Sequence, residues 1–179
     1  MQEENVKLKD GTIVTGDAFN ETDKEELLRI KEEVDNINKK VKSLGGRMIN
    51  IPEVVSEGLF AYLFNAVRTN GKTGAKSYDC VMRETGEGIQ VKAAQIEEDL
   101  TSFGPDSEWD RLFFMDFHKG SSVDIYEIPS DAIYNKVLNK SKNETFKEQQ
   151  EQGRRPRLSL KKDIIQTLNI TPIRTFKLK

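Results

Sequence analysis

The sequence has one cysteine, Cys80, and one histidine, His118, among its 179 residues. A single cysteine cannot form an internal disulfide, so a reducing compartment suits the chain. One cysteine and one histidine are too few for a typical zinc site, and they leave little basis for a catalytic site that depends on histidine. His118 stands between an apolar stretch and Lys119-Gly120-Ser121, and we interpret it as a turn residue, not as a catalyst. Carboxylates and lysines must therefore carry any chemistry.

Long apolar stretches are also missing. The longest ones span only a few residues, as at Leu112 to Met115, whereas a membrane-spanning helix needs about 20. The first residues, Met1-Gln2-Glu3-Glu4, lack the basic start and the apolar stretch of a secretory signal. We expect no membrane segment, no nucleotide cofactor and a cytoplasmic location.

The net charge of −2 argues against a protein that coats nucleic acid, but the charge is unevenly distributed. Residues 141–179 contain 10 Lys and Arg against 4 Asp and Glu, whereas acidic residues outnumber basic ones in both 1–60 and 61–140. Lys and Arg bind nucleic acids by neutralising phosphates, so the basic segment predicts a local phosphate contact. A solvated basic tail is the alternative that charge alone leaves open.

Residues 23–44 are expected to form one helix. Thr22 and Glu25 have the spacing of a capping box, and Gly45-Gly46 supplies a stop. Apolar residues recur at alternating intervals of three and four, which is the seam of a coiled coil; they are Leu27, Ile30, Val34, Ile37, Val41 and Leu44. We expect self-association through this helix. The alternative is that the same seam packs on its own domain.

A second, buried helix is expected from Pro52 to Val67, because proline suits the first helical turn and the following residues are largely apolar. Glu53 and Glu57 lie four residues apart on one face of it. A carboxylate on a buried helix needs water or a cation nearby. Arg68 and the glycine-rich residues 70–74 should end this helix.

Residues 78–83 and 88–94 predict two strands of a hairpin, joined by a tight turn that contains Gly86. Residues 111–117 are strongly apolar and predict a strand in the middle of the sheet. Residues 123–128 alternate between apolar and polar, which predicts a half-exposed strand.

The C-terminal third should contain a helix at 131–138, then a long loop or mobile segment at 139–157, where no apolar period is visible. Residues 158–179 have enough Ile, Leu and Phe to return to the core.

This order of elements predicts a mixed α/β, or α+β, domain with one central mixed sheet flanked by helices. We expect a single domain over 1–179. It would consist of an N-terminal segment with the coiled-coil-like helix (1–46), a catalytic core (47–140) and a basic C-terminal segment (141–179).

The predicted hairpin brings three polar residues together. Asp79 lies on its first strand, and Gln90 and Lys92 lie on its second, where residues two apart point to the same face. Mg²⁺ prefers hard oxygen ligands, which Asp79, Gln90 and the Val91 carbonyl would supply. A lysine beside that ion would orient a water and stabilise its hydroxide form, which is the role expected of Lys92.

These residues resemble the PD-(D/E)XK nuclease superfamily, whose signature is an Asp on one strand followed by Glu-x-Lys on the next. The matching positions are Asp79 and Gln90-Val91-Lys92, with Glu57 as the acid on the preceding helix. The resemblance implies that Asp79 and Gln90 bind metal, that Lys92 assists the water and that Glu57 supports the site. Tyr78 replaces the frequent proline before the Asp. Gln90 replaces the commoner Glu, which removes one negative charge and should weaken metal binding.

Residues 50–179 also look similar to small type II restriction endonucleases, in particular to Bsp-type enzymes that recognise GCNGC sites. The resemblance rests on Thr101-Ser102-Phe103-Gly104-Pro105, on Trp109-Asp110 and on residues 153–159. It implies a restriction-endonuclease-like fold with an N-terminal dimerisation helix, and a homodimer that hydrolyses double-stranded DNA with Mg²⁺. The residues expected to contact DNA are Ser102, Phe103, Arg154, Arg155, Arg157 and Lys161.

Two other functions stay open at this point. The chain would be a repair or recombination nuclease if it reads DNA structure instead of sequence. It would be a non-catalytic DNA-binding or interaction protein if Gln90 marks a site that has lost its activity.

Overall fold

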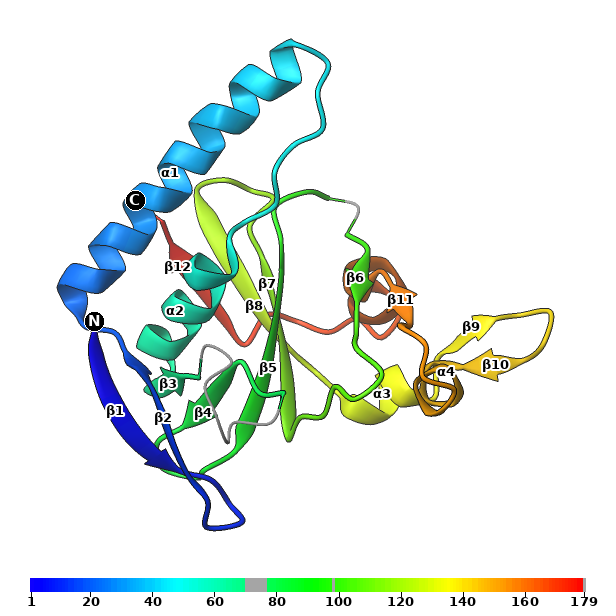
Figure 1. The fold of residues 1–179 in the computed structure, drawn as a ribbon. Helices are drawn as coiled ribbons and strands as arrows, with labels where there is room; N and C mark the ends of the chain where they lie inside the picture. The colour runs from blue at the N-terminus through cyan, green and yellow to red at the C-terminus, as the bar shows by residue number, and fades with distance from the viewer. Residues whose placement is uncertain (70–76, 98, 179) are drawn as a thin grey trace.

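A mixed sheet runs through the protein, whose computed structural model describes residues 1–69, 77–97 and 99–178 (Figure 1). Within the sheet β5 pairs parallel with β7, and the other neighbouring strands pair antiparallel. The strands, in their order across the sheet, are β1 (Gln2–Lys7), β2 (Ile13–Ala18), β3 (Ala66–Arg68), β4 (Cys80–Met82), β5 (Gly88–Ala94), β7 (Arg111–Asp116), β8 (Ser122–Ile128) and β12 (Arg174–Lys177).

Two helices cover one face of this sheet, α1 (Glu21–Ser43) and α2 (Glu53–Leu63). Gly58 of α2 lets the helices approach closely, because a Cβ atom at this position would lie 2.8 Å from Leu27 of α1. The apolar side of α2 packs on the middle strands. Its buried contacts include Val55, Leu59 and Phe60 from the helix and Val91, Phe113, Met115 and Ile125 from the sheet.

The opposite face of the sheet carries a second core and three short helices, α3 (Ser130–Tyr134), α4 (Phe146–Glu151) and the π-helix η1 (Leu160–Gln166). Two small ribbons join this side: β6 (Thr101–Ser102) with β11 (Arg157–Leu158), and β9 (Val137–Asn139) with β10 (Glu144–Thr145). Helices therefore flank a central mixed sheet on both faces, which confirms the mixed α/β prediction.

Several predicted boundaries are wrong. The cap of α1 is Asn20, which exchanges hydrogen bonds with Asp23, instead of the Thr22 and Glu25 pair. The second helix ends at Leu63, because Asn65 adopts a left-handed backbone conformation (φ 54°), and the chain continues as β3. The predicted glycine-rich turn at 70–74 lies outside the described residues.

The C-terminal third is more ordered than predicted. The expected helix at 131–138 covers only Ser130–Tyr134 and is followed by β9. The expected loop at 139–157 contains β10 and α4, and α4 begins with a capping box between Thr145 and Glu148. Strand β8 is buried at four of its seven positions instead of being half-exposed, because a core covers each of its faces: Val123 and Ile125 pack on the side of α2, and Ile128 packs on the opposite side. Residues 158–178 return to the core as predicted.

The predicted seam of the first helix divides into two parts. Leu27 and Val34 are buried against the same domain, together with the polar residues Lys31 and Asn38. Ile37 and Leu44, further along, are 45% and 87% exposed. Across the described residues, no helix combines the length and the apolar character needed to span a membrane.

Candidate active site

The β4–β5 hairpin brings Asp79 beside Gln90 and Val91, as the sequence predicts. Cys80 is paired with Ile89, and the backbone N–H of Asp79 donates to the Ile89 carbonyl at 2.9 Å. Oδ2 of Asp79 accepts hydrogen bonds from the Val91 N–H at 2.8 Å and from the side-chain amide of Gln90. The carboxylate of Asp79 is therefore fixed by the neighbouring strand.

A cavity of about 540 Å³ lies between α2, β5 and β6. Four of the five residues predicted for catalysis or metal binding line it: Glu57, Asp79, Val91 and Lys92. The remaining polar and charged lining residues are Arg47, Asn50, Glu53, Ser56, Asp99, Thr101 and Ser102. Gln90 is 3% exposed, and its side chain contacts Asp79 behind the cavity wall.

Burial raises the pKa of two of the four carboxyl groups that line the cavity, those of Glu57 and Asp79. The pKa of Glu57 rises to about 7, mainly through burial and next through the negative charge of Asp79. The pKa of Asp79 rises to about 6, again mainly through burial, while the positive charge of Lys92 and the Val91 N–H oppose the rise. Two carboxylates that resist ionisation side by side would be stabilised by a cation between them.

The donor set fits a hard divalent cation. Two partly desolvated carboxylates and a main-chain carbonyl are oxygen ligands of the kind that Mg²⁺ binds while it keeps several waters. No cluster of three or more His, Cys, Asp or Glu side chains with ligand spacing is found among the described residues. Such a cation would therefore need water or substrate oxygens to complete its coordination.

Arg68 is a charged partner of the site that the sequence analysis missed. Its Nε donates to Glu57 Oε2 at 2.6 Å, and both side chains are about 10% exposed. Arg68 lies on β3, a segment that the sequence analysis assigned to the end of a helix. The contact of Arg68 with Glu57 could therefore not be predicted. The helix-stopping Asn65 would have been the signal for a strand at this position.

Asp99 is a second residue that sequence reasoning missed. It is 6% exposed and lines the cavity, and its carboxylate accepts hydrogen bonds from the Ser159 hydroxyl at 2.6 Å and the Leu160 N–H at 2.8 Å. Asp99 therefore caps η1 and ties it to the cavity wall. The residues around Asp99 in the sequence contain no signal for this long-range contact.

The β6–β11 ribbon brings two of the expected DNA-binding residues together. Ser102 of β6 is the direct cross-strand partner of Arg157 of β11, although 54 positions separate them. The hydroxyl of Ser102 is buried and has no hydrogen-bond partner, while Arg157 is exposed. Arg155, two residues earlier, is also exposed.

Phe103, Arg154 and Lys161 have internal contacts that the sequence did not predict. The ring of Phe103 is fully buried against Trp109 and Phe146, so the prediction that it contacts DNA is wrong for this conformation, and it serves the core. Arg154 is exposed, but it forms an ion pair with Glu144. Lys161 Nζ lies 2.8 Å from Asp116 Oδ2.

The surroundings of Lys161 argue against the expected role of this residue as a DNA contact. Its side chain is 13% exposed, and Asp116, at the end of β7, is 2% exposed. Lys161 therefore neutralises a buried carboxylate and is not a free phosphate ligand in this conformation. His118 lies in the turn after β7, as predicted, with Nδ1 2.7 Å from Asp116 Oδ1.

Comparison with known proteins gives two matches. The model of the Bsp6I restriction endonuclease family matches residues 19–167. The chain is 31% identical over 145 residues to the type II restriction enzyme Bsp6I of Bacillus sp. (strain RFL6), an alignment that covers 80% of this chain and 81% of that protein. No solved structure matches the chain.

Proposed function

The chain belongs to the Bsp6I restriction endonuclease family and is a type II restriction endonuclease that acts on double-stranded DNA, and we propose that the cavity lined by Glu57, Asp79 and Lys92 is its catalytic site. The observation that carries this proposal is the convergence of these residues. They come from α2, from the residue just before β4 and from β5, and they line one cavity that is also lined by Ser102 of the β6–β11 ribbon.

Each side chain of the proposed site has a separate role in phosphodiester hydrolysis. Lys92 orients the attacking water and stabilises its hydroxide form, since an ammonium group favours the charged form of a nearby water. The Val91 N–H and the Gln90 amide hold Asp79 in one orientation, and Arg68 holds Glu57. These contacts fix the charged groups before DNA binds, so little reorganisation is required during the reaction.

We propose Mg²⁺ as the cofactor, held by Asp79 and the Val91 carbonyl with Glu57 in support. A bound divalent cation neutralises the negative charge that develops on the phosphate and lowers the pKa of water. The amide group of Gln90 faces Asp79 with its nitrogen. Gln90 would therefore offer its oxygen as a ligand only after the amide turns over, and in the present orientation it acts through Asp79.

The arrangement supports assignment to the PD-(D/E)XK superfamily with Gln90 in the place of the usual acid. The β6–β11 ribbon, with the exposed side chains of Arg157 on β11 and of Arg155 just before it, is the proposed surface for DNA beside the cavity, and the buried hydroxyl of Ser102 does not reach that surface. The GCNGC specificity and the cytoplasmic location that follow from the sequence interpretation stay predictions.

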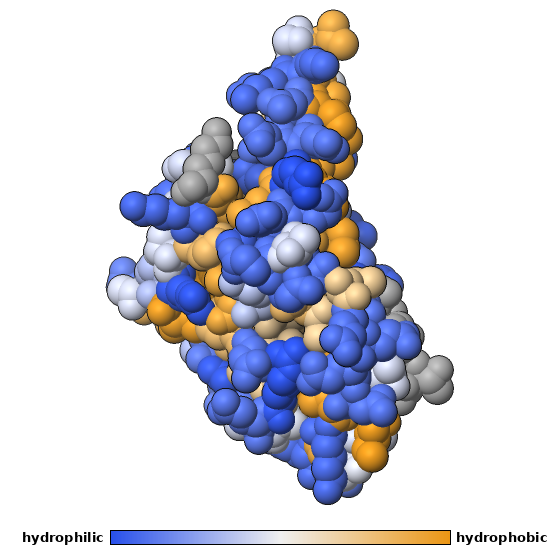
Figure 2. Space-filling model, turned by 90° about the vertical axis from the view of Figure 1, so that its left-hand side faces the viewer, coloured by the Kyte–Doolittle hydropathy of each residue, from blue (hydrophilic) through white to orange (hydrophobic). Residues whose placement is uncertain are grey.

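We propose that the enzyme is a homodimer through the distal half of α1. This part of the helix projects from the body (Figure 1), and an apolar strip runs along one side of the projection (Figure 2). Ile37, Leu44 and Ile49 are exposed large hydrophobic residues in this region. Two-fold pairing of a flat apolar strip buries it from water and would place two catalytic sites on one palindromic target.

Sedimentation velocity tests the dimer with Ile37→Asp combined with Leu44→Asp. The wild-type protein is expected to sediment as a dimer and this variant as a monomer. The matched control is Leu168→Asp with Ile173→Asp, which also changes two exposed hydrophobic residues but lies outside α1. A dimer that persists in the α1 variant contradicts the proposed interface.

Digestion of a plasmid with purified protein and Mg²⁺ tests the function. Discrete fragments are the expected result for a site-specific endonuclease. A smear, or cutting only at branched DNA, would instead indicate a structure-specific repair or recombination nuclease. DNA binding without metal and without cleavage in Mg²⁺ or Mn²⁺ would indicate a non-catalytic binding protein.

A further inference from the structure

The ribbon formed by β9 and β10 is an antiparallel pair that belongs neither to the main sheet nor to the lining of the cavity. Together with its flanking residues it covers 136–147, which we call the hairpin arm. The arm extends away from the body on the side of the sheet that carries β6 and β11 (Figure 1). A two-stranded ribbon is marginal on its own in water, so the arm must be held by its surroundings.

The charge of the hairpin arm is nearly all of one sign. It contains four lysines, namely Lys136, Lys140, Lys142 and Lys147, and one acid, Glu144. Lys140 and Lys142 lie in the exposed four-residue turn that joins the strands. Acidic residues outnumber basic ones in both 1–60 and 61–140, so this turn adds concentrated positive charge to a protein whose net charge is −2.

Glu144, the acidic residue of the arm, is paired with neighbouring side chains at the base of the ribbon. Glu144 forms an ion pair with Arg154 and accepts hydrogen bonds from the side-chain amides of Gln149 and Gln152, both at 3.1 Å. These contacts, the Arg154 hydrogen bond first, hold the pKa of Glu144 at about 2. Glu144 therefore stays ionised and fastens the arm to α4, and it lies at the start of β10, outside the turn that carries the two lysines.

The base of the arm is anchored in the second core. The N–H of Phe146 donates to the Lys136 carbonyl at 2.8 Å, and the Phe146 ring is fully buried between Phe103 and Tyr134. Phe103 directly follows Ser102, which lines the cavity. Packed aromatic rings thus hold the base of the arm in a fixed position relative to the cavity wall.

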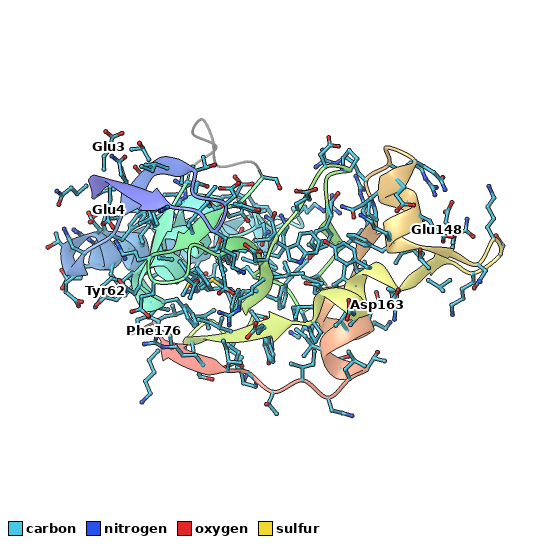
Figure 3. The ribbon with its side chains drawn as sticks, turned by 90° about the horizontal axis from the view of Figure 1, so that it is seen from below. Glu3, Glu4, Tyr62, Glu148, Asp163 and Phe176 are labelled. Atoms are coloured by element: carbon cyan, nitrogen blue, oxygen red, sulfur yellow. The ribbon has the colours of Figure 1, made fainter. Side chains whose placement is uncertain are left out.

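The arm lies at the opposite end of the molecule from the acidic N-terminal hairpin. Figure 3 shows Glu148 and Asp163 on the arm's side of the structure and Glu3 and Glu4 of β1 at the far end. The separation of these charges means that an extended anion approaching the cavity from the arm side avoids the acidic strand. Duplex DNA carries one negative charge per about 1.7 Å of its axis, and a long duplex can contact the cavity and the arm at the same time.

We propose that the hairpin arm binds the phosphate backbone of duplex DNA outside the cleaved site, through Lys140 and Lys142. This inference rests on the proposed function, because it assumes that DNA lies across the cavity. Lysine acts on phosphate as a point charge without reading bases, so the arm would add affinity for flanking DNA without changing the recognised sequence.

The test compares two duplexes that contain one cleavage site mapped from the plasmid digest, with flanks of 3 or 15 base pairs. Binding is measured by fluorescence anisotropy with Ca²⁺ in place of Mg²⁺. For Lys140→Ala with Lys142→Ala, we expect the Kd for the long-flank duplex to rise roughly tenfold, and the slope of log K against log salt concentration to fall by about 0.9 for each lost contact. The short-flank duplex should bind as it does to wild type.

Two further variants make the result specific. Lys140→Arg with Lys142→Arg keeps the charge and should keep long-flank binding. Lys7→Ala with Lys177→Ala removes two exposed lysines from β1 and β12, far from the cavity elements, and should leave both duplexes unaffected.

The failures of the two proposals are distinguishable. If wild type cuts the plasmid but the Lys140 and Lys142 alanine variant binds both duplexes with wild-type affinity and salt slope, the arm does not contact DNA and the inference is overturned. Equal losses on the short and the long duplex would also overturn it, since they would place the arm within the cleaved site. If wild type neither binds nor cuts duplex DNA, the proposed function itself fails.

Discussion

Changing Gln90 to Glu would place a second carboxylate against Asp79 in the β4–β5 hairpin. In the present structure the Gln90 amide donates to Asp79 Oδ2, and the residue is 3% exposed. A hydrogen bond to a charged group contributes about 1.5–3 kcal/mol to stability. The substitution removes that donor and adds a like charge in a place where burial already raises the pKa of Asp79 to about 6.

The size of the effect follows from these contacts. Without metal at pH 7.5, the loss of the hydrogen bond alone predicts a decrease in stability of roughly 1.5–3 kcal/mol. For a domain of this size, 1 kcal/mol corresponds to about 2–4 °C in Tm, so a decrease of roughly 3–12 °C is expected. Uptake of a proton by the carboxylate pair limits further repulsion, since one carboxyl group can then donate to the other.

Magnesium should reverse this loss, because the same two carboxylates become ligands. A ligand present at about 100 times its Kd stabilises the folded state by roughly 2.7 kcal/mol. Differential scanning fluorimetry across a Mg²⁺ series should therefore show a larger rise in Tm for Gln90→Glu than for wild type, with a lower half-saturating concentration.

Gln95→Glu is the matched control. The Gln95 amide also donates to a carboxylate, that of Asp35 at 3.1 Å, but neither residue lines the cavity. This variant should lose stability without metal, and Mg²⁺ should not restore it. If Mg²⁺ stabilises Gln90→Glu no more than wild type, or stabilises both variants equally, the argument that Asp79 and Gln90 adjoin a metal site is refuted.

Three further predictions concern the pKa values and the buried contacts. The folded-state pKa is about 7 for Glu57 and about 6 for Asp79, against 4.5 and 3.8 in the unfolded chain, so their contribution to stability is complete below about pH 4 and is lost as the pH rises to 7. The urea midpoints at pH 5 and pH 8 should therefore differ less in Glu57→Gln than in wild type. An equal difference argues against the raised pKa of Glu57. Arg68→Ala removes the hydrogen-bond donor of Glu57, whose pKa then rises further so that the carboxyl group is protonated near pH 7, and should cost about 1.5–3 kcal/mol in urea unfolding. A loss below about 1 kcal/mol would mean that the pair is solvated. Phe103→Ala should cost about 3–5 kcal/mol because the ring is fully buried; unchanged stability with weakened DNA binding would restore Phe103 as a DNA contact.

The hairpin that carries Asp79, Gln90 and Lys92 was predictable because all its information is local. Alternating residues on a strand have a period of two, and a turn with Gly86 (φ 69°) fixes which residues pair. The position of Glu57 needed one more step, the packing of α2 on the sheet, and the largely apolar sequence of that helix indicated its burial.

Contacts between distant residues were not predictable in the same way. The pairing of Ser102 with Arg157, the capping of η1 by Asp99 and the neutralisation of Asp116 by Lys161 join residues more than 40 positions apart. Each contact depends on how the second core closes, which no local period encodes.

The hairpin arm shows a different kind of failure. Residues 139–157 have no apolar period, because a single ring, Phe146, anchors the segment. The signal for order was nevertheless present, since Thr145 and Glu148 have the capping-box spacing that begins α4. Polar composition alone was therefore a poor guide to order in this segment.

The most direct test of the central claim is plasmid cleavage in Mg²⁺ by Asp79→Asn and Lys92→Ala, measured together with binding of an uncut duplex. Asp106→Asn and Lys162→Ala, which change exposed residues outside the cavity, are the matched controls. We predict that both site variants bind the duplex and leave the plasmid uncut, while both controls cut it into the wild-type fragments. Wild-type fragments from either site variant would contradict the assignment of Asp79 and Lys92 to catalysis.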